Sequence, residues 1–188
     1  MRKIILVTLS LILVASPAVW SMPPDEAISQ ANQAYYDGDY AKALDLLREA
    51  LQGVWNQAPL SVRNANFVEA APEGPGQYKP RQGDVFESID PILLYFEPVG
   101  YTVIKQGEEY KYALSSDFAV VDDQGKELGR QKDVGRSEAT SRMFNMELMM
   151  LLTINLKGLP QGKYKLVVTL KDLNSDKTTT FEKPFGIR

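Results

Sequence analysis

The sequence predicts a mainly β protein with a small α part, in which a two-helix hairpin precedes an antiparallel β-sandwich. The first observation is periodicity: apolar residues recur at helical spacing from Asp25 to Leu51, and at the alternating spacing of strands from residue 84 onward. The second is the density of proline and glycine over residues 57–83, which separates the two regions. The chain is 44% hydrophobic and 24% charged, which is typical of a globular protein and argues against disorder.

The first 21 residues have the pattern of a secretory signal peptide. Two basic residues precede the apolar run Ile4–Val14, and small residues follow it up to Ser21, so cleavage is expected after Ser21 or Ala18. The run is shorter than the roughly 20 residues that span a bilayer. We therefore expect a periplasmic or secreted protein with no stable membrane span after cleavage. A retained anchor is the alternative, if the run extends through Trp20.

Residues 22–56 form the predicted helical hairpin. Two helices fit the apolar spacing, with a break at residues 37–39. Gly38 can adopt the left-handed conformation that ends the first helix, and Asp39 can cap the second. Ala43 and Ala50 lie seven residues apart on one face and are small enough to let the helices approach closely.

This hairpin resembles a single tetratricopeptide repeat over residues 25–54. The resemblance is carried by Ala34-Tyr35, Gly38-Asp39-Tyr40, Ala43-Leu44, Leu47 and Ala50-Leu51. It departs at Trp55, where the family usually has proline. Repeats of this type bury their faces against neighbours, so a single copy is expected to pack on the rest of the chain or on a partner. The family's usual role implies that the hairpin binds peptide segments, whereas a hairpin that covers the sandwich is the alternative.

Residues 57–83 are predicted to be an irregular connection with a possible edge strand at Asn64–Glu69, followed by a sandwich domain over residues 84–188. The even spacing of the alternating segments favours two antiparallel layers. The predicted strands are Ile92–Glu97, Tyr110–Leu114, Phe118–Val121, Phe144–Leu156, Tyr164–Leu170 and Thr178–Phe185.

Part of this region resembles immunoglobulin-like folds. The stretch Leu159–Leu166 looks like the run before a late strand in those folds, where a tyrosine hydroxyl bonds back to the turn, and Tyr164 is the matching residue. The segments Tyr95–Tyr101 and Asp172–Lys177 resemble exported bacterial proteins of uncharacterised function, over most of residues 65–188. That resemblance implies location and fold but no activity.

Composition excludes several classes of function. The chain has no cysteine and no histidine, which excludes disulfides, thiolate nucleophiles, Cys/His zinc sites and Ser-His-Asp triads. Removing the leader takes two of 21 basic residues and none of 24 acids, which leaves 19 against 24 and a net charge of −5. No basic face is evident, so nucleic-acid binding is not expected. We predict a non-catalytic protein without a cofactor.

Two segments have the residue types of a metal site, although we predict no metal. Thioethers suit Cu(I), but strand alternation places Met146 and Met150 in the core and leaves only Met143 and Met149 on the other face. The segment from Asp172 to Asp176 begins like a calcium loop, but lysine follows where glycine is needed. A hairpin turn explains the same residues. A metal-binding periplasmic protein remains an alternative.

Carboxylates allow a further alternative, an enzyme or binder that acts on cell-wall or other polysaccharide. Paired acids can hydrolyse a glycosidic bond without histidine or cysteine. The acids near predicted strand ends are Glu97, Asp117, Asp122 and Asp123.

The main hypothesis is an adaptor that binds another exported protein or peptide. Tyrosine and arginine are favoured at the centres of protein interfaces. The residues predicted to form the partner-binding surface are Tyr36, Tyr40, Tyr78, Arg81, Tyr95, Glu97 and Tyr101. For the members outside the hairpin, packing of the connection against the sandwich is the alternative.

Overall fold

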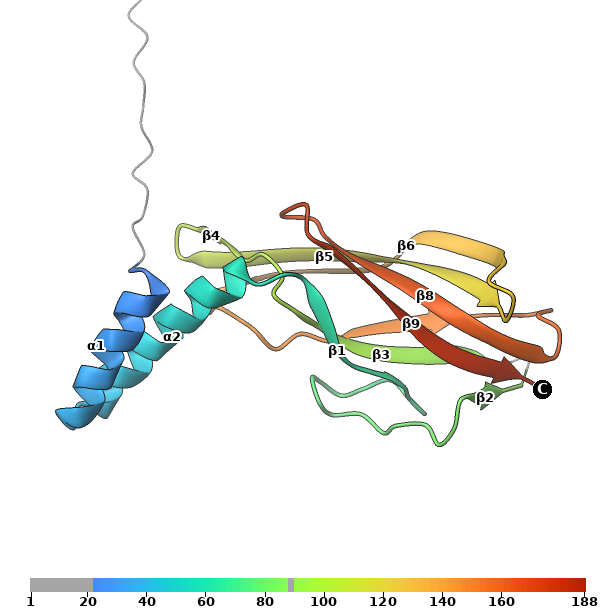
Figure 1. Cartoon of the computed structure of the whole chain (residues 1–188), viewed down its shortest axis with the longest axis horizontal. Coiled ribbons are helices and arrows are strands. Elements are labelled where there is room, and N and C mark those ends of the chain that lie inside the picture. Colours follow the sequence, from blue (N-terminus) through green and yellow to red (C-terminus); the bar gives the residue numbers. More distant parts are fainter. Residues whose placement is uncertain (1–21, 88–89) are drawn as a thin grey trace, which may run out of the picture.

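The computed structural model describes residues 22–87 and 90–188, so the predicted signal peptide lies outside the described residues. Two helices are followed by nine strands within these ranges, which confirms the mainly β fold with a small α part (Figure 1). The helices form a hairpin and the strands form two sheets, in the order that the periodicity predicts.

The hairpin consists of α1 (Pro24–Tyr36) and α2 (Tyr40–Gln57). Gly38 has a φ of +80°, the left-handed conformation expected between the two helices. The Asp39 carboxylate accepts a hydrogen bond of 3.1 Å from the backbone N–H of Lys42 and caps α2 as predicted. No helix within the described ranges is long and apolar enough to cross a bilayer.

The two helices are held together by a seam of small side chains. The buried residues of this seam are Ala27, Ala31 and Ala34 of α1 and Ala43, Leu46 and Ala50 of α2. Alanine allows the two helix backbones to approach closely. Each helix contacts the other with one face, and its remaining faces lie outside the seam.

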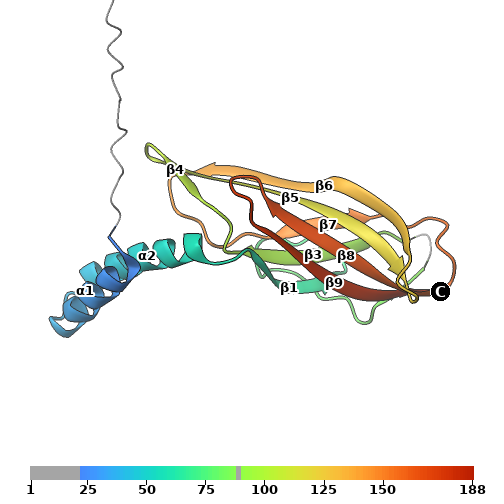
Figure 2. The same cartoon turned by 45° about the horizontal axis from the view of Figure 1, so that its top comes forward.

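The hairpin projects beyond one end of the sandwich, and only the C-terminal end of α2 reaches the sheets (Figures 1 and 2). Trp55, near that end, is buried in the sandwich core. The side-chain oxygen of Asn56 accepts from the backbone N–H of Val103 at 3.3 Å. The expectation of a hairpin that covers the sandwich does not describe this arrangement, because the length of both helices stands clear of the sheets.

The smaller sheet has three antiparallel strands in the order β1-β3-β7. They are β1 (Ser61–Phe67), β3 (Ile92–Val99) and β7 (Met150–Ile154). The predicted edge strand in the connection is real but begins earlier, at Ser61. Its pairing with β3 shifts register between Arg63 and Asn66, where Asn64 has a φ of +53°. This bulge bends β1 at the sheet edge.

The larger sheet has the order β2-β9-β8-β5-β4, and β6 also pairs with β5. Its strands are β2 (Val85–Phe86), β4 (Ile104–Gln106), β5 (Glu109–Asp122), β6 (Glu127–Ser141), β8 (Gly162–Asp172) and β9 (Thr178–Ile187). All pairs are antiparallel except β2 with β9. Alternate residues of the two sheets, such as Leu94 and Leu166, face each other in one buried cluster.

The predicted tyrosine corner is present. The Tyr164 hydroxyl donates a 2.7 Å hydrogen bond to the backbone oxygen of Pro160, in the turn before β8. This bond fixes the entry of β8 into the larger sheet.

Two strand predictions need correction, and one long strand was missed. The two strands predicted between Tyr110 and Val121 are one strand, β5, because residues 115–117 are also buried in the sheet. The strand predicted at Phe144–Leu156 is confined to β7, since the Asn145 side chain accepts from the backbone N–H of Glu147 and turns the chain. The long strand β6 was not predicted, because most of its residues are exposed on both faces and show no apolar alternation.

Candidate functional site

The hairpin carries an exposed apolar face beside its seam, which Asn32 interrupts on α1. In α1, Ile28 and Tyr35 each follow a buried alanine, and in α2, Leu44, Leu47 and Leu51 each follow a buried seam residue. Successive helical residues point about 100° apart, so in two antiparallel helices these positions fall on the same side of the hairpin. We name this surface the apolar hairpin face. Its members are Ile28, Tyr35, Tyr40, Leu44, Leu47, Leu51 and Val54.

Every member of the apolar hairpin face is substantially exposed, from 45% for Leu51 to 61% for Tyr40. The spacing on α2, from Tyr40 through Leu44, Leu47 and Leu51 to Val54, alternates between four and three residues. That is the apolar repeat of helices that pack against another helix. The seam residues of α2 pack on α1, whereas the side chains of this stripe are exposed, so the stripe has no packing partner among the described elements.

Two of the predicted binding residues lie at the tip of this hairpin. The ring centroid of Tyr35 lies 5.6 Å from that of Tyr36 and 5.6 Å from that of Tyr40, both in edge-to-face geometry. Tyr36 is 77% exposed. Three tyrosines therefore pack together at the tip of the hairpin, where the apolar hairpin face ends.

Three further predicted residues, Tyr78, Tyr95 and Glu97, are brought together on the smaller sheet. The Tyr95 hydroxyl donates to Oε1 of Glu97 at 2.5 Å and accepts from the backbone N–H of Gly76 at 2.7 Å. The rings of Tyr78 and Tyr95 lie 4.1 Å apart. Burial, together with the hydrogen bond to Glu97, raises the pKa of Tyr95 to about 12. These contacts pack the connection against the sandwich, which is the alternative that the sequence left open.

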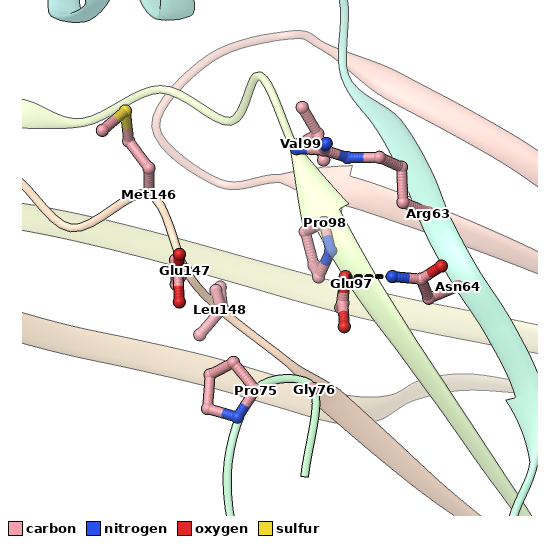
Figure 3. A pocket seen from close by; sticks show the side chains of 10 residues that line it. All are labelled: Arg63, Asn64, Pro75, Gly76, Glu97, Pro98, Val99, Met146, Glu147 and Leu148. Atoms are coloured by element: carbon pink, nitrogen blue, oxygen red, sulfur yellow. Dashed lines mark hydrogen bonds between the residues drawn. The ribbon is translucent and has the colours of Figure 1, made fainter. Parts of the chain in front are cut away.

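A pocket of about 310 Å³ lies beside this group. Figure 3 shows Glu97 of β3 and Glu147 of the segment before β7 on opposite sides of it. Oε2 of Glu97 accepts from the side chain of Asn64 at 2.7 Å, so both oxygens of this carboxylate are occupied by bonds within the chain. Glu97 therefore holds β1 and the connection in place.

Tyr95 and Tyr101 are fully buried, which corrects the expectation that they contribute to a binding surface. The Tyr101 hydroxyl donates to the backbone oxygen of Asn145 at 2.8 Å, and burial followed by the nearby Tyr112 raises its pKa. Tyr95 is covered by Gly76 and Tyr78 of the connection. Tyr101 packs against Trp55 of α2 and Tyr112 of β5.

Arg81 lies apart from the tyrosines of the hairpin. Its guanidinium carbon is 4.5 Å from the centroid of the Phe86 ring, and one terminal nitrogen donates to the backbone oxygen of Val85 at 2.8 Å. These contacts attach the end of the connection to β2. The predicted surface thus separates into the hairpin tip, the Tyr78 group and Arg81.

The Asp172–Lys177 turn has a structural role. The Asp172 carboxylate is buried and accepts from Thr102 N–H at 2.7 Å, Ser175 Oγ at 2.8 Å and Asn174 N–H at 3.0 Å. The Lys177 ammonium donates to backbone oxygens of Asn56 and of the β3–β4 loop. The Lys177 bonds join the turn to the end of α2, and the bonds accepted by Asp172 give this residue of the calcium-like pattern a structural role.

The methionines do not gather into one site. Met150 is buried in the core, as alternation predicts, but Met146 lies before β7 and is only partly buried against the core, and Met143 is 74% exposed. Over residues 22–87 and 90–188, no group of three or more acidic residues has the proximity needed to hold a metal ion.

The other candidate acids are engaged locally. Asp117 is buried on β5, where Lys171 lies 2.7 Å away and Asp133 N–H donates at 2.9 Å. Burial opposes its ionisation, but these hydrogen bonds and the lysine charge outweigh it and lower the pKa of Asp117. Asp122 accepts from the backbone of the β5–β6 turn. The structure therefore does not bring Asp117 or Asp122 to the pocket beside Glu97.

No protein-family model and no curated protein matches this chain. Several solved structures are similar at low identity, among them the following three. The alkylpurine DNA glycosylase AlkC of Pseudomonas fluorescens, bound to DNA containing an abasic site analogue, is 12% identical with a TM-score of 0.38, over 88% of this chain and 43% of that chain. The present chain thus spans less than half the length of that protein.

An immunoglobulin-like protein of Pseudomonas aeruginosa is 14% identical with a TM-score of 0.34, over 70% of this chain and 98% of that chain. A family 123 glycoside hydrolase of Clostridium perfringens is 12% identical with a TM-score of 0.32, over 69% of this chain and 27% of that chain. At these identities and scores, the likeness carries no information on what this chain binds or catalyses.

Proposed function

We propose that this protein is a non-catalytic, exported interaction module that binds another polypeptide chain through the apolar hairpin face. The single observation that carries the proposal is the exposure of Leu44, Leu47 and Leu51 along one stripe of α2. The signal-peptide pattern of residues 1–21 supports export to the periplasm or beyond.

The size of the apolar hairpin face supports binding. Monomeric soluble proteins rarely expose contiguous apolar patches of more than a few hundred Å². Seven large side chains, each about half exposed, present on the order of 800 Å², which is the share that one partner contributes to a standard interface. Leaving this area in water carries a free-energy penalty that a bound partner removes.

The shape of the face indicates the kind of segment it binds. A stripe with alternating four- and three-residue spacing accepts a second helix whose apolar residues follow the same repeat. The tyrosines at the tip add rigid aromatic area at one end of the stripe, and tyrosine is favoured at the centres of interfaces. The expected ligand is therefore an amphipathic helix or helical hairpin of a polypeptide.

The test compares two leucine-to-glutamate variants with different surroundings. Leu47→Glu places a charge in the apolar hairpin face, whereas Leu128→Glu changes a leucine of similar exposure on β6. Tagged wild type and both variants are used to capture chains from a periplasmic extract, and each captured protein is purified and its affinity remeasured. Binding that is lost in Leu47→Glu and kept in Leu128→Glu supports the proposal. Binding that is equal in both variants contradicts it.

The polysaccharide alternative receives less support from the contacts of Glu97. A glycosidase pair needs two carboxyl groups that can reach the substrate. Glu97 is committed to Tyr95 and Asn64, so Glu147 lines the pocket without a second available acid beside it. The metal alternative receives less support because Asp172 is already satisfied by donors of its own turn and of Thr102.

A further inference from the structure

We infer that the apolar hairpin face binds a second copy of this chain, so that two hairpins stack face to face as a four-helix bundle around a two-fold axis. In this bundle α2 packs antiparallel on α2 of the second copy, and α1 packs on α1. The inference rests on the proposed function, because it names the polypeptide that occupies the same face.

The charge distribution allows two identical faces to meet. All seven members of the apolar hairpin face are uncharged, so pairing two copies brings no like charges together across its centre. At the border of the stripe, Arg48 lies 3.1 Å from Asp45 of the same helix. This pair carries no net charge, so the two-fold arrangement brings no unpaired arginine of α2 against its copy.

The spacing of the stripe matches an antiparallel pair. Leu47 is the midpoint between Tyr40 and Val54. A two-fold axis near Leu47 places Leu44 of one copy at the level of Leu51 of the other, and Tyr40 at the level of Val54. Every layer of the pair is then apolar.

The position of the hairpin leaves room for the second copy. Both views show α1 and α2 extending beyond the end of the sandwich (Figures 1 and 2). Since α2 runs toward the sandwich, antiparallel stacking places the two sandwiches at opposite ends of the bundle. The 18 residues of α2 form a helix of about 27 Å, long enough for four to five layers of side chains.

The area is that of a stable dimer. If each copy buries its apolar hairpin face, the total is on the order of 1,600 Å², the size of a standard specific interface. Helix pairs of this type bury leucine on leucine, so the centre of the interface would be as apolar as a protein core.

The first experiment measures the mass of the purified protein, expressed from the full chain, by sedimentation between about 1 and 100 µM, a range suited to an interface of this size. Wild type and Leu128→Glu are expected to be dimers. Leu47→Glu is expected to weaken the dimer at least about 100-fold, because symmetry places two buried carboxylates near each other. A monomeric wild type, or a dimer that survives Leu47→Glu, overturns the inference.

The second experiment fixes the orientation and uses the absence of cysteine from the chain. Arg48→Cys places a thiol beside the proposed axis, whereas Ala41→Cys places it seven residues away on the same border of α2. In the antiparallel dimer the two thiols introduced by Ala41→Cys are about 20 Å apart along the helix direction. A short thiol crosslinker is expected to join Arg48→Cys copies and to leave Ala41→Cys copies single. Equal crosslinking of both variants overturns the antiparallel arrangement.

Failure of this inference is separable from failure of the proposed function. A monomeric wild type that loses a captured heterologous chain through Leu47→Glu disproves the dimer and keeps the docking function. A monomeric wild type whose captured chains are unaffected by Leu47→Glu disproves both.

Discussion

The indole N–H of Trp55 donates a 2.9 Å hydrogen bond to the backbone oxygen of Tyr101, and the two rings pack edge to face with centroids 5.2 Å apart. Trp55 is the last large side chain of α2, and Tyr101 follows β3. This pair therefore joins the hairpin to the sandwich at the position where the tetratricopeptide pattern would have proline.

Trp55→Ala is expected to destabilise the protein by about 3–5 kcal/mol, since it empties a buried aromatic site. Trp55→Phe retains most of the packing but leaves the Tyr101 carbonyl without its donor, for a loss of about 1–2 kcal/mol. Urea unfolding followed by circular dichroism measures both. An alanine variant as stable as wild type would show that Trp55 does not anchor the hairpin.

Ionisation of Tyr95 is expected to lower the stability of the protein at alkaline pH. Its pKa rises from 10.0 to about 12 on folding, so the folded state favours the neutral phenol. The stabilisation is complete below pH 10 and is lost as the pH rises from 10 toward 12. Tyr95→Phe should cost about 1–2 kcal/mol at pH 7 and lose less stability across that window than wild type. Melting temperatures of both proteins at pH 7 to 12 test this, and parallel curves would contradict it.

Gly100 is expected to tolerate no side chain. Its φ is +76°, and an added Cβ would lie 2.4 Å from the backbone oxygen of Pro59. Gly100→Ala should therefore cost at least about 3 kcal/mol, from the clash together with the left-handed strain. Gly107 has a φ of +62° with nothing near its Cβ position, so Gly107→Ala reports the strain alone, about 1–2 kcal/mol. Equal losses of stability in the two variants would show that the contact with Pro59 does not contribute to the effect of Gly100→Ala.

Leu46 and Leu47 are neighbours in sequence, but their replacement by alanine is expected to change the stability by different amounts. Leu46 is 9% exposed in the seam between the helices, so Leu46→Ala should destabilise the protein by about 2–3 kcal/mol. Leu47 points away from the seam, so Leu47→Ala should change the stability of the monomer by less than about 1 kcal/mol. Thermal unfolding at low protein concentration separates the two. Similar losses would place Leu47 inside the hairpin core.

Asp172 is expected to stabilise the fold without calcium. Asp172→Asn weakens the hydrogen bonds from Thr102, Asn174 and Ser175, with an expected loss of about 1–3 kcal/mol. Millimolar calcium should leave the melting temperature of wild type unchanged, because the carboxylate already has three donors. A calcium-dependent rise in wild type that Asp172→Asn abolishes would restore the metal alternative.

The sequence was sufficient to predict the elements whose residues obey a local rule. Gly38 and Asp39 have local reasons to end one helix and begin the next, and Tyr164 has a local partner at Pro160. The alternation of β8 reflects a face that is buried along its whole length. Such patterns are visible because each depends on neighbours within a few residues.

The remaining differences arise from tertiary contacts. Strand β6 pairs with β5, but most of its residues are exposed, so they include charges in place of an apolar pattern. These charges also discourage pairing of its edge with other chains. Tyr95 and Tyr101 looked like surface residues because the sequence does not show that the connection and the loops cover them.

The leucines of α2 were recognised as helical, but their exposure was not predicted. Two apolar sets offset by one residue, Ala43 and Ala50 beside Leu44 and Leu51, are the signal that one helix serves two partners. Only the direction in which the hairpin leaves the sandwich shows that the second set has no partner among the described residues.

The hairpin is attached to the sandwich by the end of α2, so a small rotation of this helix about Trp55 moves the opposite end of the hairpin most. Tyr40, at the opposite end of α2, is about 22 Å from Trp55 along the helix axis. A tilt of α2 by a few degrees about Trp55 therefore moves the tyrosines at the tip by more than an ångström. The hydrogen bonds that join Asn56 to Val103 and to Lys177 oppose that tilt. A force that a bound partner exerts on the tip therefore acts on the contacts of Asn56 with the loop after β3 and with the Asp172–Lys177 turn.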